Sequence, residues 1–322
     1  MRLLRCIFSV LTVLTAIPLF ASDRIFESFA DELPVSARSV IFFDLRKIRV
    51  SPLRAVSPGT EGSIGLLSAG EKAFAGQGVD PAFSTGAFFF SGEYAALLLD
   101  SSLSPELLTK YSSSEHGEAS GIIVTETGTD SGCSIFLLKS PEDDRMKDDV
   151  LACSFSPDRT GRLFLSTASR LPSFLRSERG WNSEARACMA HLPAGAALEG
   201  ILYPDSSVFP GEGSSPLWNG VGRIAFAFSW KEGDPYPFRG NVLFFPRTSE
   251  EAGTVRRSLE NLVQSAYAAG REKGEIRPEM LFAFQVLPGH GCTELRIQLT
   301  GPDADDFVDL FVSQLKKGVF GK

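Results

Sequence analysis

The sequence predicts an α+β protein made of two tandem related units, each a mainly antiparallel sheet with helices packed on one face. The first observation behind this prediction is a block that occurs twice: an amphipathic helix, a Leu-Pro stop and a strand, at 25–45 and again at 185–203. Leu33 and Leu192 are 159 residues apart, and the Gly-Cys pairs at 132–133 and 291–292 have the same spacing. Two landmarks with one offset indicate an internal duplication.

The second observation is that the strand segments are joined in pairs by short turns. These turns lie at Gly92-Glu93 and around 128–132, 157–161 and 288–291. A short turn connects neighbouring antiparallel strands, whereas parallel strands need a longer crossover. The chain has no regular strand–helix–strand spacing, so a doubly wound parallel sheet is not expected.

The first unit begins with a helix at 24–33, because Phe26, Phe29 and Leu33 repeat with helical spacing. Asp23 is the expected N-cap, and Pro34 ends the helix because proline disfavours helical geometry in the residue before it. Shorter helices are expected at 104–111 and 168–175. Segments rich in β-branched and aromatic residues predict seven strands, at 39–45, 86–91, 94–99, 121–127, 133–139, 149–155 and 162–166.

The second unit repeats the helix and strand, at 183–192 with Ser183 as cap and at 196–203. A capping signature at 248–251 predicts the start of a long helix that ends near residue 269, and a last helix is expected at 303–316. The remaining strands of this unit are expected at 222–230, 240–245, 280–287 and 292–299.

The front of the chain has the pattern of a secretory signal peptide. Residues 1–21 combine a basic start, a short apolar run and a small residue before a polar segment. The run is shorter than the ~20 residues that span a bilayer, so we expect no stable membrane span after cleavage. The expected division is a signal peptide at 1–21, a first repeat unit at 22–180 and a second at 181–322, in a secreted or periplasmic protein. The alternative is an uncleaved N-terminal anchor.

The charge distribution argues against nucleic-acid binding. The formal net charge is −7, and lysines and arginines do not cluster. A nucleic-acid-binding surface needs a positive footprint that displaces counterions. We therefore expect no nucleic-acid partner.

Four cysteines follow the signal segment: Cys133, Cys153, Cys188 and Cys292. An exported protein permits disulfides, and Cys153–Cys188 is a candidate pair. The alternative for both is a buried core thiol, because Cys153 alternates with apolar strand residues and Cys188 lies on the apolar face of a helix. The spacings and the three histidines do not predict a zinc site.

Signatures of catalysis and of cofactor binding are absent from the sequence. It contains no nucleophile elbow, zinc-protease motif, P-loop or dinucleotide fingerprint. The Ser-x-x-Lys match at 313–316 lacks its companion motifs, and the acidic stretch at 142–149 lacks calcium-loop spacing. We therefore expect no catalytic residue, metal or cofactor.

Two long loops at equivalent places of the proposed repeat are the candidate ligand-binding segments, because binding residues concentrate on loops held by a rigid scaffold. The loop at 46–63 carries Arg46 and Arg49, and the loop at 204–220 carries Trp218 and follows Tyr203. The alternative is a pair of ordinary connections.

The preferred function is a non-catalytic binding or envelope-associated scaffold protein. One alternative is a secreted hydrolase with an unrecognised site between the two halves. Another is a protein partner bound through a free sheet edge, since open antiparallel sheets leave unpaired strands.

Overall fold

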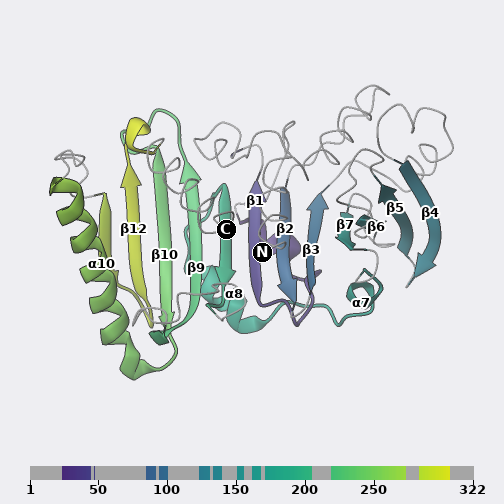
Figure 1. Ribbon diagram of the computed structural model, residues 1–322, viewed down its shortest axis with the longest axis horizontal. Helices are drawn as coiled ribbons and strands as arrows, with labels where there is room; N and C mark the ends of the chain where they lie inside the picture. Colours follow the sequence, from purple (N-terminus) through teal and green to yellow (C-terminus); the bar gives the residue numbers. More distant parts are fainter. Residues whose placement is uncertain are drawn as a thin grey trace.

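In the computed structural model, the described residues form one twelve-stranded antiparallel sheet (Figure 1), in the order β11-β12-β10-β9-β8-β1-β2-β3-β7-β6-β5-β4. The structure describes residues 24–44, 47, 85–91, 94–100, 123–130, 133–139, 151–155, 162–167, 171–204, 219–272 and 283–304. The mixed helix-and-sheet class and the antiparallel pairing that the sequence predicts are therefore confirmed. The sheets of the two halves are continuous.

The strands of the first half are β1 (Ser39–Asp44), β2 (Thr85–Ser91), β3 (Tyr94–Asp100), β4 (Ile123–Asp130), β5 (Cys133–Lys139), β6 (Leu151–Phe155) and β7 (Arg162–Thr167). Those of the second half are β8 (Leu198–Leu202), β9 (Val221–Trp230), β10 (Phe238–Pro246), β11 (Phe284–Pro288) and β12 (Thr293–Leu299). The helices are α2 (Ile25–Phe29), α7 (Leu171–Leu175), α8 (Ser183–Ala190), the 3-10 helix η3 (Ser249–Glu251) and α10 (Ala252–Glu272). Each strand lies within three residues of its predicted start, except β11, which begins four residues later.

The two halves join where β1 pairs antiparallel with β8. Val40 lies opposite Ile201, and Phe42 lies opposite Glu199. The 159-residue offset takes Val40 to Glu199 and Phe42 to Ile201, so it exchanges these two facing pairs. Both residues that the offset relates at the core, Phe42 and Ile201, are fully buried.

The two Gly-Cys pairs, which are also 159 residues apart, do not lie at equivalent positions of the sheet. Cys133 is the first residue of β5 and Cys292 comes directly before β12, but β12 lies next to β10, whereas β7 and β6 separate β5 from β3. The neighbour of β3 is β7, so β7 and not β5 has the place beside β3 that β12 has beside β10. The expected equivalence of the two Gly-Cys strands is therefore wrong.

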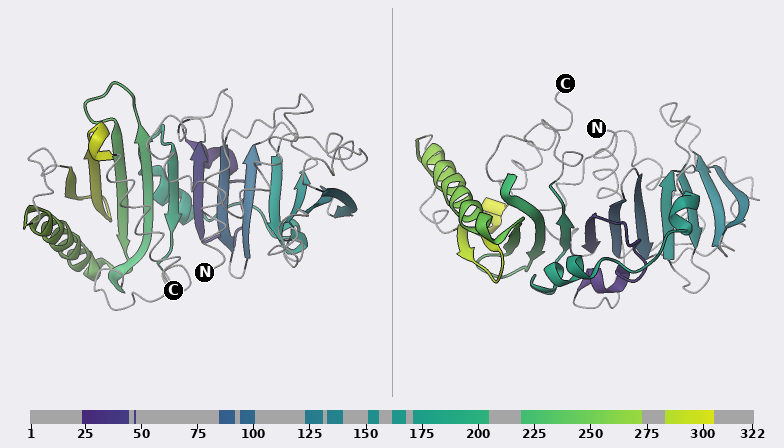
Figure 2. Two further views of the ribbon diagram at one scale, coloured as in Figure 1. Left: turned by 45° about the horizontal axis from the view of Figure 1, so that its top comes forward. Right: turned by 90° about the horizontal axis from the view of Figure 1, so that it is seen from below.

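The described helices lie on both faces of the sheet, which corrects the prediction that they pack on one face. On β10, Leu243 and Phe245 belong to the core under α2 and α8, whereas Val242 and Phe244 pack with residues of α10. Because successive side chains of a strand point to opposite faces, α10 covers the face opposite to α2 and α8. Figure 2 shows α10 and α2 on opposite sides of the sheet.

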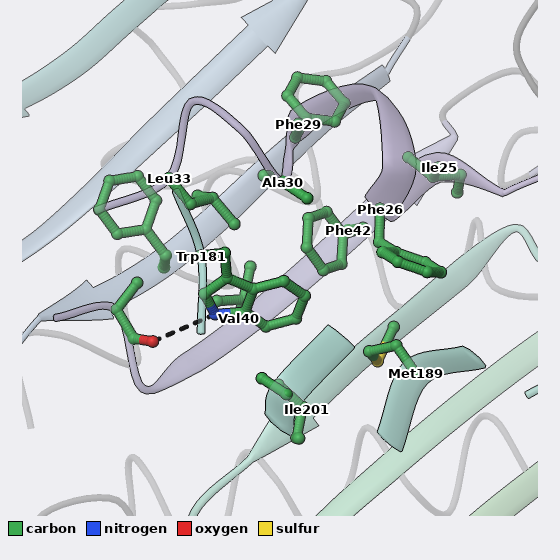
Figure 3. Close-up of a cluster of buried hydrophobic side chains, with 14 of the residues drawn as sticks. Ile25, Phe26, Phe29, Ala30, Leu33, Val40, Phe42, Trp181, Met189 and Ile201 are labelled. Atoms are coloured by element: carbon green, nitrogen blue, oxygen red, sulfur yellow. Dashed lines mark hydrogen bonds between the residues drawn. The ribbon is translucent and has the colours of Figure 1, made fainter. Parts of the chain in front are cut away.

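The core of the junction is aromatic and draws on both halves (Figure 3). The ring of Phe42 on β1 lies 5.4 Å from Trp181, which precedes α8, and 6.2 Å from Phe26 on α2. The indole Nε1 of Trp181 donates to the carbonyl oxygen of Ala37 at 3.1 Å. A buried indole needs such an acceptor, so this bond fixes the segment before α8 on the end of β1.

Side chains fix where the longer helices begin. Asn182, not the expected Ser183, is the N-cap of α8, and its Oδ1 accepts from the backbone N–H of Glu184 at 2.7 Å. The predicted capping signature is confirmed, because the N–H of Thr248 donates to Glu251 Oε2 at 3.0 Å. Asp23, the expected cap of α2, lies outside the described residues.

Candidate functional site

Of the four predicted ligand-binding residues, the structure describes Tyr203. Arg46, Arg49 and Trp218 lie outside the described residues, so the proposed groove between the two loops is not tested. Tyr203 follows β8 and packs against the main core. It belongs to a group of polar and sulfur-containing side chains at one end of β8, β9, β10 and β12.

These side chains form a row across four strands. Leu202 pairs with Ile224, Arg223 pairs with Phe245, and Phe244 pairs with Thr293. These pairings place the side chains of Tyr203, Arg223, Phe245 and Cys292 next to one another, on the sheet face that α8 covers. Tyr203 and Cys292 pack against the core cluster that contains Phe245 and Cys188. We call Glu184, Cys188, Tyr203, Arg223 and Cys292 the Cys188–Cys292 cluster.

Arg223 is the centre of this cluster. Its Nη1 forms an ion pair with Glu184 Oε1 of α8, and its guanidinium carbon lies 5.9 Å from the ring centroid of Phe245. It also hydrogen-bonds the hydroxyl of Tyr203. Burial raises the pKa of Tyr203, and the positive charge of Arg223 opposes that shift. The arginine therefore fastens α8 to the ends of β8 and β9.

The two thiols of the cluster are free in this structure. Burial raises the pKa of Cys188, with Arg223 opposing the shift. Burial also raises the pKa of Cys292, and the charges of Glu294 and Cys188 raise it further. Because the thiolate is the nucleophilic form of cysteine, a raised pKa leaves less of that form at neutral pH.

The candidate disulfide between Cys153 and Cys188 is not formed. Cys188 is a free, buried thiol on α8, which packs on β8 and β9. Cys153 lies on β6, five strand positions from β8. At about 4.8 Å per strand, that separation far exceeds the ~7 Å between Cα atoms that a disulfide can bridge.

Cys292 also lines a surface pocket of about 530 Å³. The pocket lies where the end of β10, the start of α10 and the β11–β12 turn meet, and its wall includes the cationic side chains Arg247 and Arg256. Both arginines are engaged: Arg256 Nε lies 2.8 Å from Glu260 Oε1, and Arg247 Nη2 donates to the carbonyl oxygen of Pro204 at 3.4 Å. Glu251 already caps the start of the helix.

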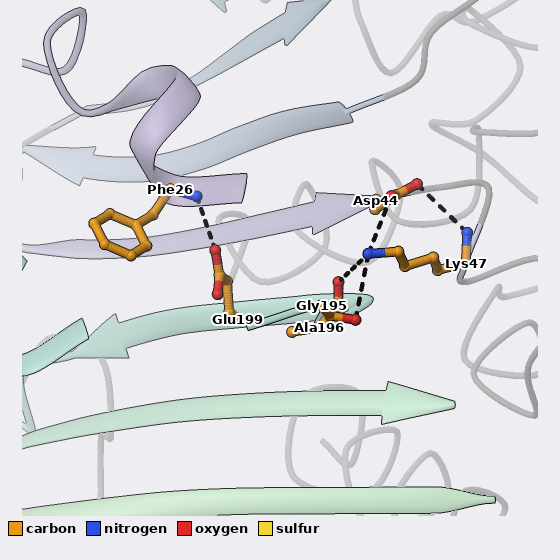
Figure 4. A network of polar contacts seen from close by, with 6 residues as sticks. All are labelled: Phe26, Asp44, Lys47, Gly195, Ala196 and Glu199. Carbon is orange, nitrogen blue, oxygen red and sulfur yellow. Dashed lines mark hydrogen bonds and ion pairs between the residues drawn. The ribbon is translucent and has the colours of Figure 1, made fainter. Parts of the chain in front are cut away.

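A second polar group lies at the junction of the halves (Figure 4). Glu199 on β8 is 1 % exposed, and its Oε1 accepts from the backbone N–H of Phe26 at 2.8 Å. Burial raises its pKa, and the Phe26 hydrogen bond opposes the shift. A side chain of the second half thus satisfies a donor at the start of α2 in the first half.

Asp44 and Lys47 connect the halves at the end of β1. Lys47 Nζ lies 3.7 Å from Asp44 Oδ2 and donates to the carbonyl oxygens of Gly195 and Ala196, both at 3.3 Å (Figure 4). The backbone N–H of Asp44 donates to Ala197 at 2.8 Å. These bonds fix the turn before β8 against β1.

Arg162 forms the corresponding attachment in the first half. Its Nη1 lies 2.7 Å from Asp100 on β3, its Nε lies 3.1 Å from Glu32, and its Nη2 donates to the carbonyl oxygen of Ser28 at 2.7 Å. The guanidinium stacks on Phe29, 4.1 Å from the ring centroid. Arg162 thus ties α2 to β3 and β7.

Glu199 and Arg162 are not among the site residues that the sequence predicts. A signal for Glu199 is present, because it is the one charge in the apolar run 196–203. A charge inside a buried strand needs a partner or a bond to the backbone. Arg162 has no comparable signal, because an arginine at the first position of a strand is usually a solvated side chain.

The described residues contain no group of three or more metal-ligating side chains. Within the described part of the chain, no helix is long and apolar enough to cross a membrane. The signal segment lies outside the described residues.

Comparisons with known proteins give little. No family model matches the chain, and no curated protein matches it. A solved structure described as crystal form I of TP0453 is similar over 88 % of this chain and 96 % of its own, at 8 % sequence identity and a TM-score of 0.42. That similarity is too low to support a conclusion about fold or function.

Proposed function

We propose that this chain is an exported, non-catalytic protein that acts as a binding or envelope-associated scaffold. The observation that carries the proposal is the use of its buried charged groups. Glu199, Arg162 and Asp44 are each buried. Glu199 and Arg162 are bonded to the backbone of another element, and Asp44 is paired with Lys47, which itself donates to the backbone before β8. Groups held in this way stabilise the arrangement of strands and helices, and they are poorly placed to exchange protons with a substrate.

The chemistry of the Cys188–Cys292 cluster agrees with this proposal. Both thiols have a raised pKa, and Tyr203 is hydrogen-bonded to an arginine that is itself paired with Glu184. At the junction, the face under α2 and α8 is filled by buried side chains such as Phe42 and Trp181. That filling disfavours a hydrolytic site between the halves on this face.

An internal duplication is part of the proposal. A two-fold axis between β1 and β8 would exchange the pairs Val40–Ile201 and Phe42–Glu199, which is what the 159-residue offset does. The helix before each strand supports the same relation, because α2 and α8 both pack on the junction core. The hairpin β4–β5 at the sheet edge would then be an insertion in the first half, because β7 beside β3 matches β12 beside β10.

The scaffold has one longer edge at which a protein partner could add a strand. In the described residues β4, which has eight residues, pairs with β5 alone. The opposite edge strand β11 has five residues, ends at Pro288 and contacts α10. A short strand, a proline and a neighbouring helix protect an edge from pairing. We therefore place the partner at β4.

Three measurements test the proposal. Fusing residues 1–21 to a reporter that is active only after export should give activity, and a silent fusion would contradict the export. The mature chain should not turn over ester, phosphate, glycoside or peptide substrates; turnover that Tyr203→Phe abolishes would support a hydrolase instead. Adding an envelope fraction should slow backbone hydrogen exchange in β4 (123–130) but not in β11 (284–288). An equal effect on exchange in both edge strands would refute a partner at β4.

A further inference from the structure

The segment 24–37, which contains α2, is bonded to a part of the chain that follows it much later in the sequence. The backbone N–H of Trp181 donates to the carbonyl oxygen of Ala30 at 2.9 Å, and its indole Nε1 donates to that of Ala37 at 3.1 Å. Ala37 and Trp181 are 144 residues apart. Part of the docking surface of α2 is therefore absent until the second half of the chain has been made.

The beginning of α2 depends on residues that are later still. The backbone N–H of Phe26 donates to Glu199 Oε1, 173 residues along the chain, at 2.8 Å. Arg24 Nη1 donates to the carbonyl oxygens of Met189 and Ala190, at 3.3 and 3.2 Å, where α8 ends. Because a chain emerges with its N-terminus first, α2 cannot complete these bonds until β8 is present.

The docked helix begins close to the expected end of the signal segment. The expected cut follows Ala21, so only Ser22 and Asp23 lie between it and Arg24. Two residues span at most about 7 Å when fully extended. Ile25, the next residue, is 2 % exposed. A peptidase binds an extended chain on both sides of the bond that it cuts, and a packed segment reaches that form only by local unfolding. Docking of α2 therefore leaves a very short length of chain between the cut and the packed helix.

We propose that docking of α2 onto the second half controls removal of the signal segment: a chain in which α2 is undocked is cut after Ala21, and a chain that folds first keeps residues 1–21. The cut is hydrolysis of the Ala21–Ser22 peptide bond by a membrane-bound signal peptidase. One water is consumed, Ala21 gains a carboxylate and Ser22 gains an amino group. This control rests on the proposed export. The order of folding and cleavage would then decide between a cleaved signal and an uncleaved N-terminal anchor.

The test uses the full-length precursor, residues 1–322, purified in detergent. Signal peptidase is added either to the folded precursor or to precursor that is diluted out of urea at the same moment, and mass spectrometry follows the loss of residues 1–21. The refolding precursor should be cut. The folded precursor should be cut at least about tenfold more slowly, because cleavage follows the population of the locally opened state.

Two linker variants separate the position of the cut from the stability of the fold, and circular dichroism verifies that both fold. A linker of about ten glycine and serine residues between Asp23 and Arg24 adds roughly 17 Å of flexible chain. This precursor should be cut equally fast when it is folded and when it is refolding. The matched control carries the same linker after Gly233, in the exposed β9–β10 turn, and its folded form should resist the peptidase like the parent.

A substitution at the docking surface tests the same control without changing the chain around the cut. Glu199→Ala removes the acceptor of the Phe26 N–H, so its folded precursor should be cut faster than the parent. Glu232→Ala, in the exposed turn, should not change the rate. If Glu199→Ala does not fold, the linker variants still decide.

Two results would contradict the proposal in different ways. A folded parent precursor that is cut as fast as the refolding one would overturn the control by α2 and leave the proposed export intact. A precursor that is resistant in every form, the variant with the linker before Arg24 included, would overturn both this control and the expected cleavage after Ala21.

Discussion

Replacing Glu199 with alanine should destabilise the protein, because this one side chain of β8 holds the start of α2. Its Oε1 accepts from the Phe26 N–H at 2.8 Å, and the residue is 1 % exposed. Alanine would leave that backbone donor buried and unpaired, which costs about 1–3 kcal/mol. Loss of the buried Cγ methylene adds about 0.8 kcal/mol. Removing a buried carboxyl offsets part of this, so we expect a net loss of about 1–3 kcal/mol.

The effect should depend on pH with a defined sign. Burial raises the folded-state pKa of Glu199 above its ordinary value of 4.5, so the folded state holds its proton more tightly than the unfolded state. The resulting stability is fully present below 4.5 and is lost as the pH rises through the raised folded-state pKa. Glu199→Gln keeps an acceptor oxygen without the charge and should lose this pH dependence.

The assay is equilibrium urea unfolding of the mature protein at several pH values, followed by circular dichroism. Glu232→Ala, an exposed carboxyl in the β9–β10 turn, is the control and should change stability by less than about 0.5 kcal/mol. A free energy of unfolding of Glu199→Ala within that margin of the parent at every pH would refute the role of Glu199.

Other substitutions test the remaining attachments and close contacts. Arg162→Met would leave two acidic partners, Glu32 and Asp100, without their cation. The free energy of unfolding measured in urea should fall by about 3–5 kcal/mol. A fall of less than about 1 kcal/mol, the value typical of an exposed ion pair, would contradict the buried geometry. Gly200→Ala would place a Cβ 2.5 Å from a carbonyl oxygen of β1 and should lower the thermal midpoint by the equivalent of about 2 kcal/mol or more. In Gly253→Ala the added Cβ has no atom within 4 Å, so this variant should have the stability of the parent or gain about 0.5 kcal/mol. An equal loss of stability in the two glycine variants would refute the close contact at Gly200.

The strands could be predicted from the sequence because their signals are local. Alternation and β-branched or aromatic residues identify a strand without reference to its neighbours, and β5 has the predicted bounds of 133–139. Helix starts are less certain where two capping residues are adjacent. Asn182 and Ser183 can both cap, and the asparagine carbonyl reaches the helix N–H groups in the structure.

The sheet face that each helix covers could not be predicted from the sequence. The amphipathic pattern of α10 shows that one of its sides is apolar, but β10 offers an apolar surface on each face: Leu243 and Phe245 on one, Val242 and Phe244 on the other. The position of β5 in the sheet could not be predicted from the sequence either. The hairpin β6–β7, and not β4–β5, lies beside β3, and strand order depends on contacts between segments distant in the sequence.

Tyr203 is proposed from the sequence as an aromatic ligand-binding residue at a long loop, and that role stays a prediction. In the structure it lies in the Cys188–Cys292 cluster. The spatial neighbours of Cys188 are not predictable from the sequence, because they depend on how α8 packs on the ends of β8 and β9.

The central claim is that the two halves join in one sheet through β1 and β8, in the register that sets Phe43 opposite Leu198. Cysteine cross-linking in a background without the native thiols tests this register directly. Facing residues on antiparallel strands have Cβ atoms about 4.5–5.5 Å apart and diagonal ones about 7–8 Å. Phe43→Cys with Leu198→Cys should therefore cross-link on mild oxidation, and Ile41→Cys with Leu198→Cys should not. The reverse result, or no cross-link in a folded protein for either pair, would contradict the continuous sheet.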